Sequence, residues 1–286
     1  AAAWTAWAAW QQWFATPAGP ADPRLTFETP FRNVRPHVKY VGDDNCTWCH
    51  GDIGASYAAH SMGQSMAPIA QASAIEKIDK VARFEAHGFE YTVVQTPGGV
   101  KHHERLRDAK GNELLLAAFD VAYAVGSGTR GRSYLIRRGD QLFQSPISWY
   151  SGTSQWDIAP GYQKQNRHFE RAIPPPCVFC HANQTAPVAG TSNRYEPPLF
   201  RGHAIGCERC HGPGELHVAR QESGERYPGP DDTIVNPARL AGDLRNDVCA
   251  QCHLQGEDRV LRRGRGQYDY RPGLPLQLFE VVFVRH

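Results

Sequence analysis

The sequence predicts an α+β fold, with short helices at four cysteine motifs and an antiparallel β-meander inserted after the first motif. All eight cysteines belong to Cys-x-x-Cys pairs, and a histidine follows each pair directly. The first pair ends at Cys49 and the second begins at Cys177, so 127 residues lie between them. The other three motifs follow within 77 residues. A long insertion therefore separates the first motif from a dense group of three, and much of the motif-bearing chain is expected to be irregular.

Short runs of β-branched and aromatic residues fill the insertion, and Gly, Pro, Asn and Asp residues separate them. We expect strands at 89–94, 100–107, 114–119, 121–126, 133–137 and 141–147. Successive strands joined by short turns favour an antiparallel meander. The apolar tail, residues 274–284, is also strand-like. An unpaired edge there would invite pairing with another chain.

These features divide the chain into four segments. Residues 1–23 form a tryptophan-rich arm and linker, and residues 24–80 carry the first motif. Residues 81–160 contain the inserted sheet, and residues 161–286 contain the other three motifs and the tail. Tryptophans recur every third residue in the arm, so a helix there would gather them on one face. Such an arm suits packing on its own domain, docking on a neighbouring subunit or contact with a membrane interface.

The Cys-x-x-Cys-His motif has a specific chemical meaning. Two cysteines three positions apart lie on one helical turn. Their sulfurs can bond the two vinyl groups of a porphyrin, while the adjacent histidine binds the iron. Histidine makes up 13 of the 286 residues. The probability that a histidine follows all four cysteine pairs by chance is therefore about 4 × 10⁻⁶. We therefore expect four covalently bound c haems, attached at Cys46, Cys49, Cys177, Cys180, Cys207, Cys210, Cys249 and Cys252, with proximal ligands His50, His181, His211 and His253.

A structural zinc ion is the competing interpretation, because two Cys-x-x-Cys pairs can make one tetrahedral site. Zinc does not require a histidine after every pair. The spacings also fit poorly. Between Cys180 and Cys207 lie 26 residues, and between Cys210 and Cys249 lie 38, whereas a zinc ribbon has about 15–20. Haem is the favoured interpretation.

Nine histidines remain, and chain geometry restricts which of them can bind an iron from the opposite, distal side. His217 follows His211 by six residues that include a Gly-Pro-Gly turn, so we expect it to reach a neighbouring haem. His203 precedes Cys207 by four residues, which on a helix places both on one face. It too is expected to reach a different iron. If both inferences hold, this region contributes ligands to as many as three closely packed haems.

Four further residues are distal candidates. His60 and Met62 lie in one short segment, which is expected to supply one axial ligand, and the sequence leaves open which residue it is. A thioether would raise the potential of its haem relative to a second imidazole, whereas the bland interpretation is that methionine only fills space. His102 and His168 are the other two, although a single histidine is more often a surface residue. The remaining histidines are not expected to bind iron: His37, His87, His103 and His286.

Charge and hydropathy exclude some classes of function. Acidic and basic residues nearly balance, 29 against 31, so nothing indicates a nucleic-acid partner. No apolar run approaches the eighteen or so residues of a membrane span, so membrane association is expected at most through the arm. Arginine greatly exceeds lysine, and its planar fork suits haem propionates. Six arginines lie in or near the motif-rich region: Arg201, Arg209, Arg259, Arg262, Arg263 and Arg265.

The motif-rich region resembles multihaem c-type cytochromes related to the tetrahaem electron acceptor of hydroxylamine oxidation, and especially their bacterial relatives fused to tetratricopeptide repeats. The resembling stretches are Cys177 to Asn183, Gly202 to His217 and Asn236 to Arg239, with Ser145 to Tyr150 upstream. In that group distal histidines are expected where His203 and His217 stand. Relatives often continue into further haems and repeats, and the tryptophan-rich arm has no recognised counterpart.

We therefore expect electron transfer by a tetrahaem c-type cytochrome, with mostly or entirely six-coordinate haems. Thioether attachment of this kind takes place outside the bacterial cytoplasm, which predicts a periplasmic, cell-surface or extracellular protein. Expected partners are redox proteins or neighbouring copies of the chain, and the arm and tail suggest a conductive filament as a further hypothesis. The alternative is a redox enzyme that acts on a small nitrogen or sulfur species at an open haem site.

Overall fold

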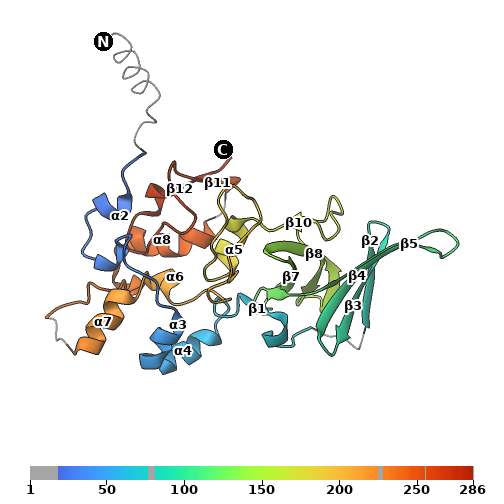
Figure 1. The fold of residues 1–286 in the computed structure, drawn as a ribbon, viewed down its shortest axis with the longest axis horizontal. Helices are drawn as coiled ribbons and strands as arrows, with labels where there is room; N and C mark the ends of the chain where they lie inside the picture. Colours follow the sequence, from blue (N-terminus) through green and yellow to red (C-terminus); the bar gives the residue numbers. More distant parts are fainter. Residues whose placement is uncertain (1–18, 77–80, 225–227, 255, 286) are drawn as a thin grey trace, which may run out of the picture.

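The computed structural model describes residues 19–286 except 77–80, 225–227, 255 and 286. The four tryptophans of the arm and His286 therefore lie outside the described residues. The structure mixes helices with antiparallel sheets, in agreement with the predicted α+β class. Figure 1 shows short helices gathered at one end of the molecule and most of the strands at the other.

The helical end is built from two stretches of chain that are far apart in sequence. The N-terminal stretch supplies α2 (Pro23–Thr26), η1 (Arg32–Val34), α3 (Asp43–Cys49) and α4 (Gly51–Ala58), with η2 (Ile69–Gln71) leading to the sheets. The C-terminal stretch supplies α5 (Pro175–His181), α6 (Glu208–His211), α7 (Glu215–Ser223), η3 (Pro237–Arg239), α8 (Gly242–His253) and η4 (Leu276–Leu278). Each cysteine motif lies at the C-terminal end of a helix, namely α3, α5, α6 and α8.

Local sequence explains where several of these helices begin and end. Pro175 opens α5 at a position where a missing backbone N–H costs nothing. Gly212, with φ of +74°, ends α6, and Gly224 ends α7 in the left-handed conformation that glycine adopts readily. The motif helices are consequently short, and most of the chain between them is irregular.

The strands form two antiparallel sheets. The four-stranded sheet has the order β2 (Val81–Ala86), β3 (Phe89–Thr96), β4 (Gly99–Arg107) and β5 (Glu113–Asp120). The six-stranded sheet has the order β1 (Met66–Pro68), β6 (Tyr123–Val125), β7 (Gly131–Arg138), β8 (Gln141–Tyr150) and β10 (Arg171–Ala172), with β9 (Gln155–Ile158) also paired to β8. All six predicted strands are present within a few residues of their predicted bounds.

The prediction of one continuous meander was wrong, because the chain changes sheets between Val121 and Ala122. The amide of Val121 still donates to Val100 in the first sheet, whereas the amide of Ala122 donates to Leu135 in the second. This switch lets both sheets contribute to one apolar core, which contains Tyr91, Val93, Ile136, Phe143, Ile147 and Trp149. Burial of two sheet faces against each other is the usual reason for such a division.

The tail is also different from the predicted unpaired strand. Residues 276–278 form η4, and β12 (Glu280–Phe283) pairs antiparallel with β11 (Asp258–Leu261). An ion pair between Arg259 and Glu280 joins the two strands. Before this ribbon, Leu274, Leu276 and Phe279 pack on the N-terminal stretch in a separate core. No helix among the described residues is long and apolar enough to cross a membrane.

Candidate haem-attachment sites

The four cysteine motifs approach one another in two pairs. The side chains of Cys46 and Cys207 are close enough to shift each other's pKa, which brings the first motif beside the third. The thiols of Cys180 and Cys252 do the same for the second and fourth motifs. The contact with Cys180 lowers the pKa of the Cys252 thiol. These four cysteines thus meet in twos, whereas a structural zinc site needs four ligands around one ion. No group of three or more metal-binding side chains occurs among the described residues.

The third motif connects with the segment that carries the first. The Glu208 side chain is buried, and its carboxylate accepts hydrogen bonds from the amides of Val41, Gly42 and Gly214 at 2.7–3.1 Å. Asp43, the first residue of α3, accepts a hydrogen bond of 2.8 Å from the amide of Cys207. The first and third attachment helices are therefore held together by polar contacts across 164 residues of sequence.

The next residue of the same motif connects with the other pair. Arg209 donates to the carbonyl of Phe179 at 3.0 Å, and its guanidinium lies 4.0 Å from the centre of the Phe179 ring. It lies 5.3 Å from the Tyr268 ring, and the Gln251 amide donates to its carbonyl. Phe179 and Gln251 belong to the second and fourth motifs. The two variable residues of the third motif, Glu208 and Arg209, therefore join all four attachment sites.

The arginine prediction holds less well. Arg209 is buried against aromatic rings, Arg259 pairs with Glu280, and Arg265 pairs with Asp22 at 3.2 Å. Arg259 and Arg265 are therefore already paired with carboxylates, whereas Nε of Arg209 is buried without a hydrogen-bond partner.

His50 and His217 lie close together, at a separation expected of two ligands to one iron. His50 lies between α3 and α4, and His217 lies on α7, yet their ring centres are 6.4 Å apart and their planes differ by 14°. Two imidazoles on opposite sides of one metal, with bonds of about 2.0 Å and ring centres about 1.1 Å further back, would have centres about 6.2 Å apart. The separation of the ring centres matches that of two ligands to one iron, and His217 lies beside a different motif from its sequence neighbour His211.

Hydrogen bonds at Nδ1 orient the rings of His217 and His211. The His217 Nδ1 lies 2.8 Å from Oδ2 of Asp231, and the His211 Nδ1 lies 2.8 Å from the carbonyl oxygen of Val235. In each case Nε2 is the atom left to bind a metal, which is the usual arrangement for a ligating histidine. Sequence reasoning missed Asp231 and Val235, because no spacing links either residue to the histidine that it contacts.

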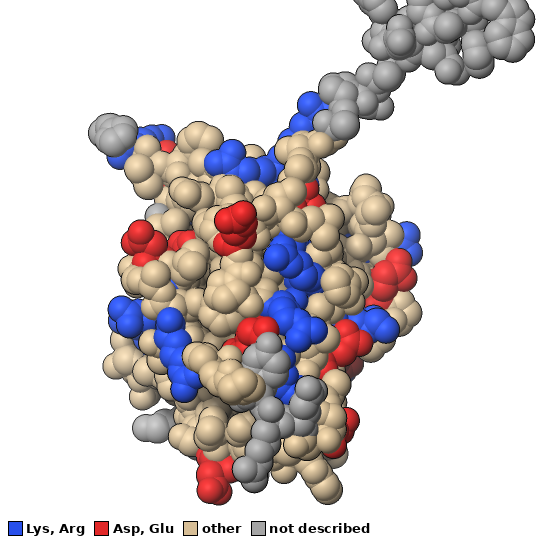
Figure 2. All heavy atoms as spheres, turned by 90° about the vertical axis from the view of Figure 1, so that its left-hand side faces the viewer, with Lys and Arg blue, Asp and Glu red and all other residues tan. Residues whose placement is uncertain are grey.

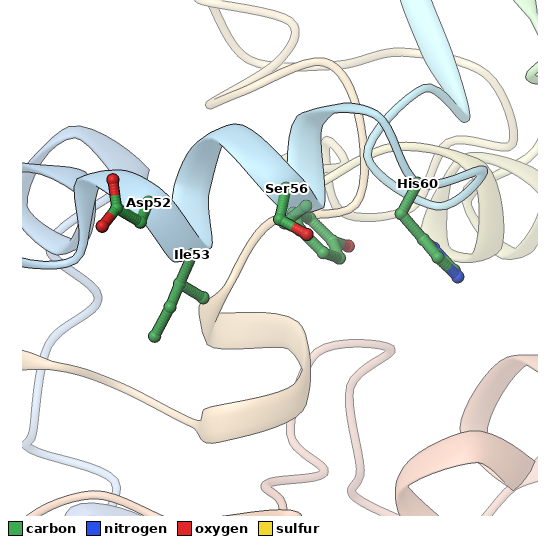
Figure 3. Close-up of a pocket in the computed structure, with 5 residues that line it drawn as sticks. Asp52, Ile53, Ser56 and His60 are labelled. Atoms are coloured by element: carbon green, nitrogen blue, oxygen red, sulfur yellow. The ribbon is translucent and has the colours of Figure 1, made fainter.

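Of His60 and Met62, only His60 lines the open pocket described along α4. A cavity of about 430 Å³ is lined by one side of α4 and the residue just beyond it, with Asp52, Ile53, Ser56, Tyr57 and His60 in its wall. Figure 3 shows these side chains along the same side of the helix. The His60 side chain is exposed, and its ring centre lies 6.1 Å from that of Tyr57. Met62 is half-buried and does not line this cavity.

The remaining candidates lie in different environments. His203 is half-buried beside Tyr123 and Phe200, with ring centres 5.8 and 5.9 Å away. Its segment is bent, since α6 begins only at Glu208, so the helical premise used for His203 was wrong. The glycines at 202 and 206 come so close to Asn183 and Asp43 that a helix with side chains there would collide with them.

His102 and His168 belong to the sheets. His102 is completely buried, its Nδ1 lies 2.7 Å from Oγ of Ser145, and burial lowers its pKa to about 3. An iron cannot approach a ring enclosed in this way, so we leave His102 out of the proposed ligands. His168 contacts the buried carboxylate of Glu104 through Nδ1 and has a positive φ of 52°. The described contacts bring it beside none of the cysteine motifs.

Comparisons with known proteins agree with this chemistry. Residues 152–212 match the family model "Cytochrome c554 and c-prime", a stretch that contains the second and third motifs. The fold is similar to the crystal structure of the outer cell wall cytochrome OcwA, with a TM-score of 0.52 and 21% sequence identity. That similarity covers 85% of this chain and 44% of the OcwA chain, so this chain spans less than half the length of that cytochrome. No curated protein matches the chain. These findings support a c-type cytochrome.

Proposed function

We propose that this protein transfers electrons through four covalently attached c haems. The observation that carries the proposal is the opposed pair His50 and His217, whose separation and near-parallel planes suit one six-coordinate iron. Each of the other three motifs presents the same two thiols and histidine at the end of a helix. When bound, the haems supply one-electron chemistry at iron, and the protein supplies ligation and spacing.

The cysteine pairs support an order of haem contacts. The first and third haems would be neighbours because Cys46 meets Cys207, and the second and fourth would be neighbours because Cys180 meets Cys252. Arg209 bridges the two pairs through its contacts with Phe179 and Gln251. An electron that enters at the first and third haems could then leave from the second and fourth haems, with every haem next to another.

Two measurements test the proposal. The intact mass should exceed that of the polypeptide by four haem masses, and each double substitution of one cysteine pair by alanine should remove one. The His217→Ala protein should convert one low-spin ferric signal to high spin in electron paramagnetic resonance, because the iron would lose its distal ligand. An intact mass equal to the polypeptide alone, or to the polypeptide plus zinc, would contradict covalent haem.

Export from the cytoplasm is part of the proposal. The similar structure belongs to a protein named an outer cell wall cytochrome, and covalent haem attachment also favours an extracytoplasmic location. On the face shown in Figure 2, basic and acidic side chains are interspersed. Redox partner proteins or neighbouring copies of the chain are the proposed partners.

A filament is a second proposal, for which the ribbon of β11 and β12 provides the observation. Val260, Phe283 and Val284 are each at least 50% exposed, which is unusual for a cluster of large apolar side chains. Addition of a neighbouring chain to this ribbon would bury them. Electron microscopy of the native protein would distinguish filaments from separate particles. A high-spin ferric signal in the unmodified protein would instead favour the redox enzyme, because catalysis needs an open iron position.

A further inference from the structure

We propose that Asp231 is a positioning residue that lowers the reduction potential of the haem bound between His50 and His217. The inference rests on the proposed function, because it assigns a role to a residue that acts through one of the two ligands. Asp231 contacts His217 on the ring nitrogen that faces away from the metal-binding atom, with an Oδ2-to-Nδ1 distance of 2.8 Å. The imidazole must then offer Nε2 to the iron.

The carboxylate is itself held in place from its other side. Oδ1 of Asp231 accepts hydrogen bonds from Nη1 of Arg220 at 2.9 Å and from the amide of Thr233 at 2.8 Å. The Thr233 hydroxyl donates to the same oxygen. Three donors therefore occupy Oδ1, while Oδ2 is directed at His217. Because its two oxygens have different partners, the Asp231 carboxylate is held in one plane. The carboxylate in turn holds the His217 ring in one orientation.

The effect on potential follows from where the proton of the imidazole lies. A carboxylate that accepts the Nδ1 proton increases the negative charge on the ring and makes Nε2 a stronger donor to the metal. Ferric iron gains more from a stronger donor than ferrous iron, because it carries one more positive charge. Both side chains are about one-quarter exposed, so the contact is only partly screened by water. The haem should therefore be harder to reduce than one whose ligand has a neutral partner.

The neighbouring residue provides a matched control. Asp232 has nearly the same exposure and also pairs with Arg220, at 2.7 Å, but among the described contacts it does not meet His217. The substitutions D231N and D232N each remove one negative charge at adjacent positions. Only D231N changes the charge of the group that accepts the imidazole proton. Any difference between the two variants therefore reports that hydrogen bond and not the general field.

We expect D231N to raise the ratio of reduced to oxidised haem, at a fixed ambient potential, at least threefold above that of D232N. At 59 mV per tenfold for one electron, this ratio corresponds to a shift of about 28 mV. The g-values of the same haem should change in D231N and stay nearly unchanged in D232N. D231E, which keeps the carboxylate, should restore most of both properties. Redox titration followed by electron paramagnetic resonance measures them together.

His217→Ala separates failure of this inference from failure of the proposed function. It should abolish one low-spin signal and so identify the haem to be followed. If no low-spin signal is lost, His217 is not a ligand, and both the site and this inference fail. If the signal is lost but D231N behaves as D232N does, the role of Asp231 is overturned while the ligand pair stands.

A variant without a charge change covers the case in which D231N does not fold. Thr233→Val removes a neutral hydroxyl donor that competes for the Asp231 carboxylate. The remaining negative charge should then interact more strongly with His217 and lower the potential, which is the opposite sign from D231N. An unchanged potential and unchanged g-values in this variant would count against the proposal.

Discussion

The buried histidine of the sheet core should make the folded protein sensitive to mild acid. His102 is 0% exposed, and burial lowers its pKa from 6.5 to about 3. Below pH 6.5 the unfolded chain binds a proton at this residue and the folded chain does not, until the pH approaches 3. Stability from neutral His102 is therefore fully present above pH 6.5 and is lost as the pH falls. Between pH 7 and pH 5 this residue alone should lower the free energy of unfolding by about 2 kcal/mol.

The His102→Asn variant isolates this contribution. An asparagine side chain can still reach the Ser145 hydroxyl, which lies 2.7 Å from Nδ1 in the wild-type protein, but it does not titrate. Urea unfolding of the haem-loaded proteins, followed by far-ultraviolet circular dichroism at pH 7 and pH 5, gives the two pH dependences. Other groups that titrate are common to both proteins, so their effects cancel in the difference. Equal losses of stability in the two proteins would refute the reasoning.

Three further predictions concern packing and the ferric signal. Arg132→Ala should lower the free energy of unfolding by up to about 3 kcal/mol, because Arg132 is buried and Glu76 would keep only the hydrogen bonds from Tyr134 and the Ile75 amide. Arg194→Ala, at the exposed pair with Asp140, should cost less than about 1 kcal/mol. Gly63→Ala should lower the free energy of unfolding by about 1–3 kcal/mol, since the new Cβ would lie 2.3 Å from the Tyr57 carbonyl oxygen. At Gly152 a new Cβ would have no atom within 4 Å. Equal stability of the Gly63→Ala and Gly152→Ala proteins would contradict this. The imidazole planes of His50 and His217 differ by only 14°, and parallel imidazoles interact with the same iron d orbital. We therefore expect the haem between them to give a rhombic low-spin ferric signal. An axial shape for the low-spin signal that disappears in His217→Ala would contradict this.

Local signals were sufficient for the six predicted strands and not for their division into sheets, and Val81–Ala86, Gln155–Ile158 and Asp258–Leu261 were not predicted. Alternating residues and turn residues indicate where Phe89–Thr96 and Gly131–Arg138 run, because both depend on neighbours in sequence. The change of sheet at Val121 has no local signature, because it depends on which apolar face finds a partner. The short strands Met66–Pro68 and Arg171–Ala172 were missed for the same reason: each is defined only by the strand beside it.

The histidines show the same division at the functional site. A lone histidine carries no record of its surroundings, so His102 and His60 were both candidates until the fold enclosed the first and left the second at an open pocket. The bend before α6 likewise depends on the approach of Asn183 and Asp43, which are remote in sequence.

The sequence by itself predicts the chemistry of attachment, because thioether bonds and proximal ligation need only five consecutive residues at each motif. Only the tertiary structure decided which motifs are neighbours and which histidine faces which. Cys46 meets Cys207, and His50 meets His217, through contacts between segments more than 150 residues apart. Such contacts are selected by burial and hydrogen bonding over the whole chain, and no short pattern of residues records them.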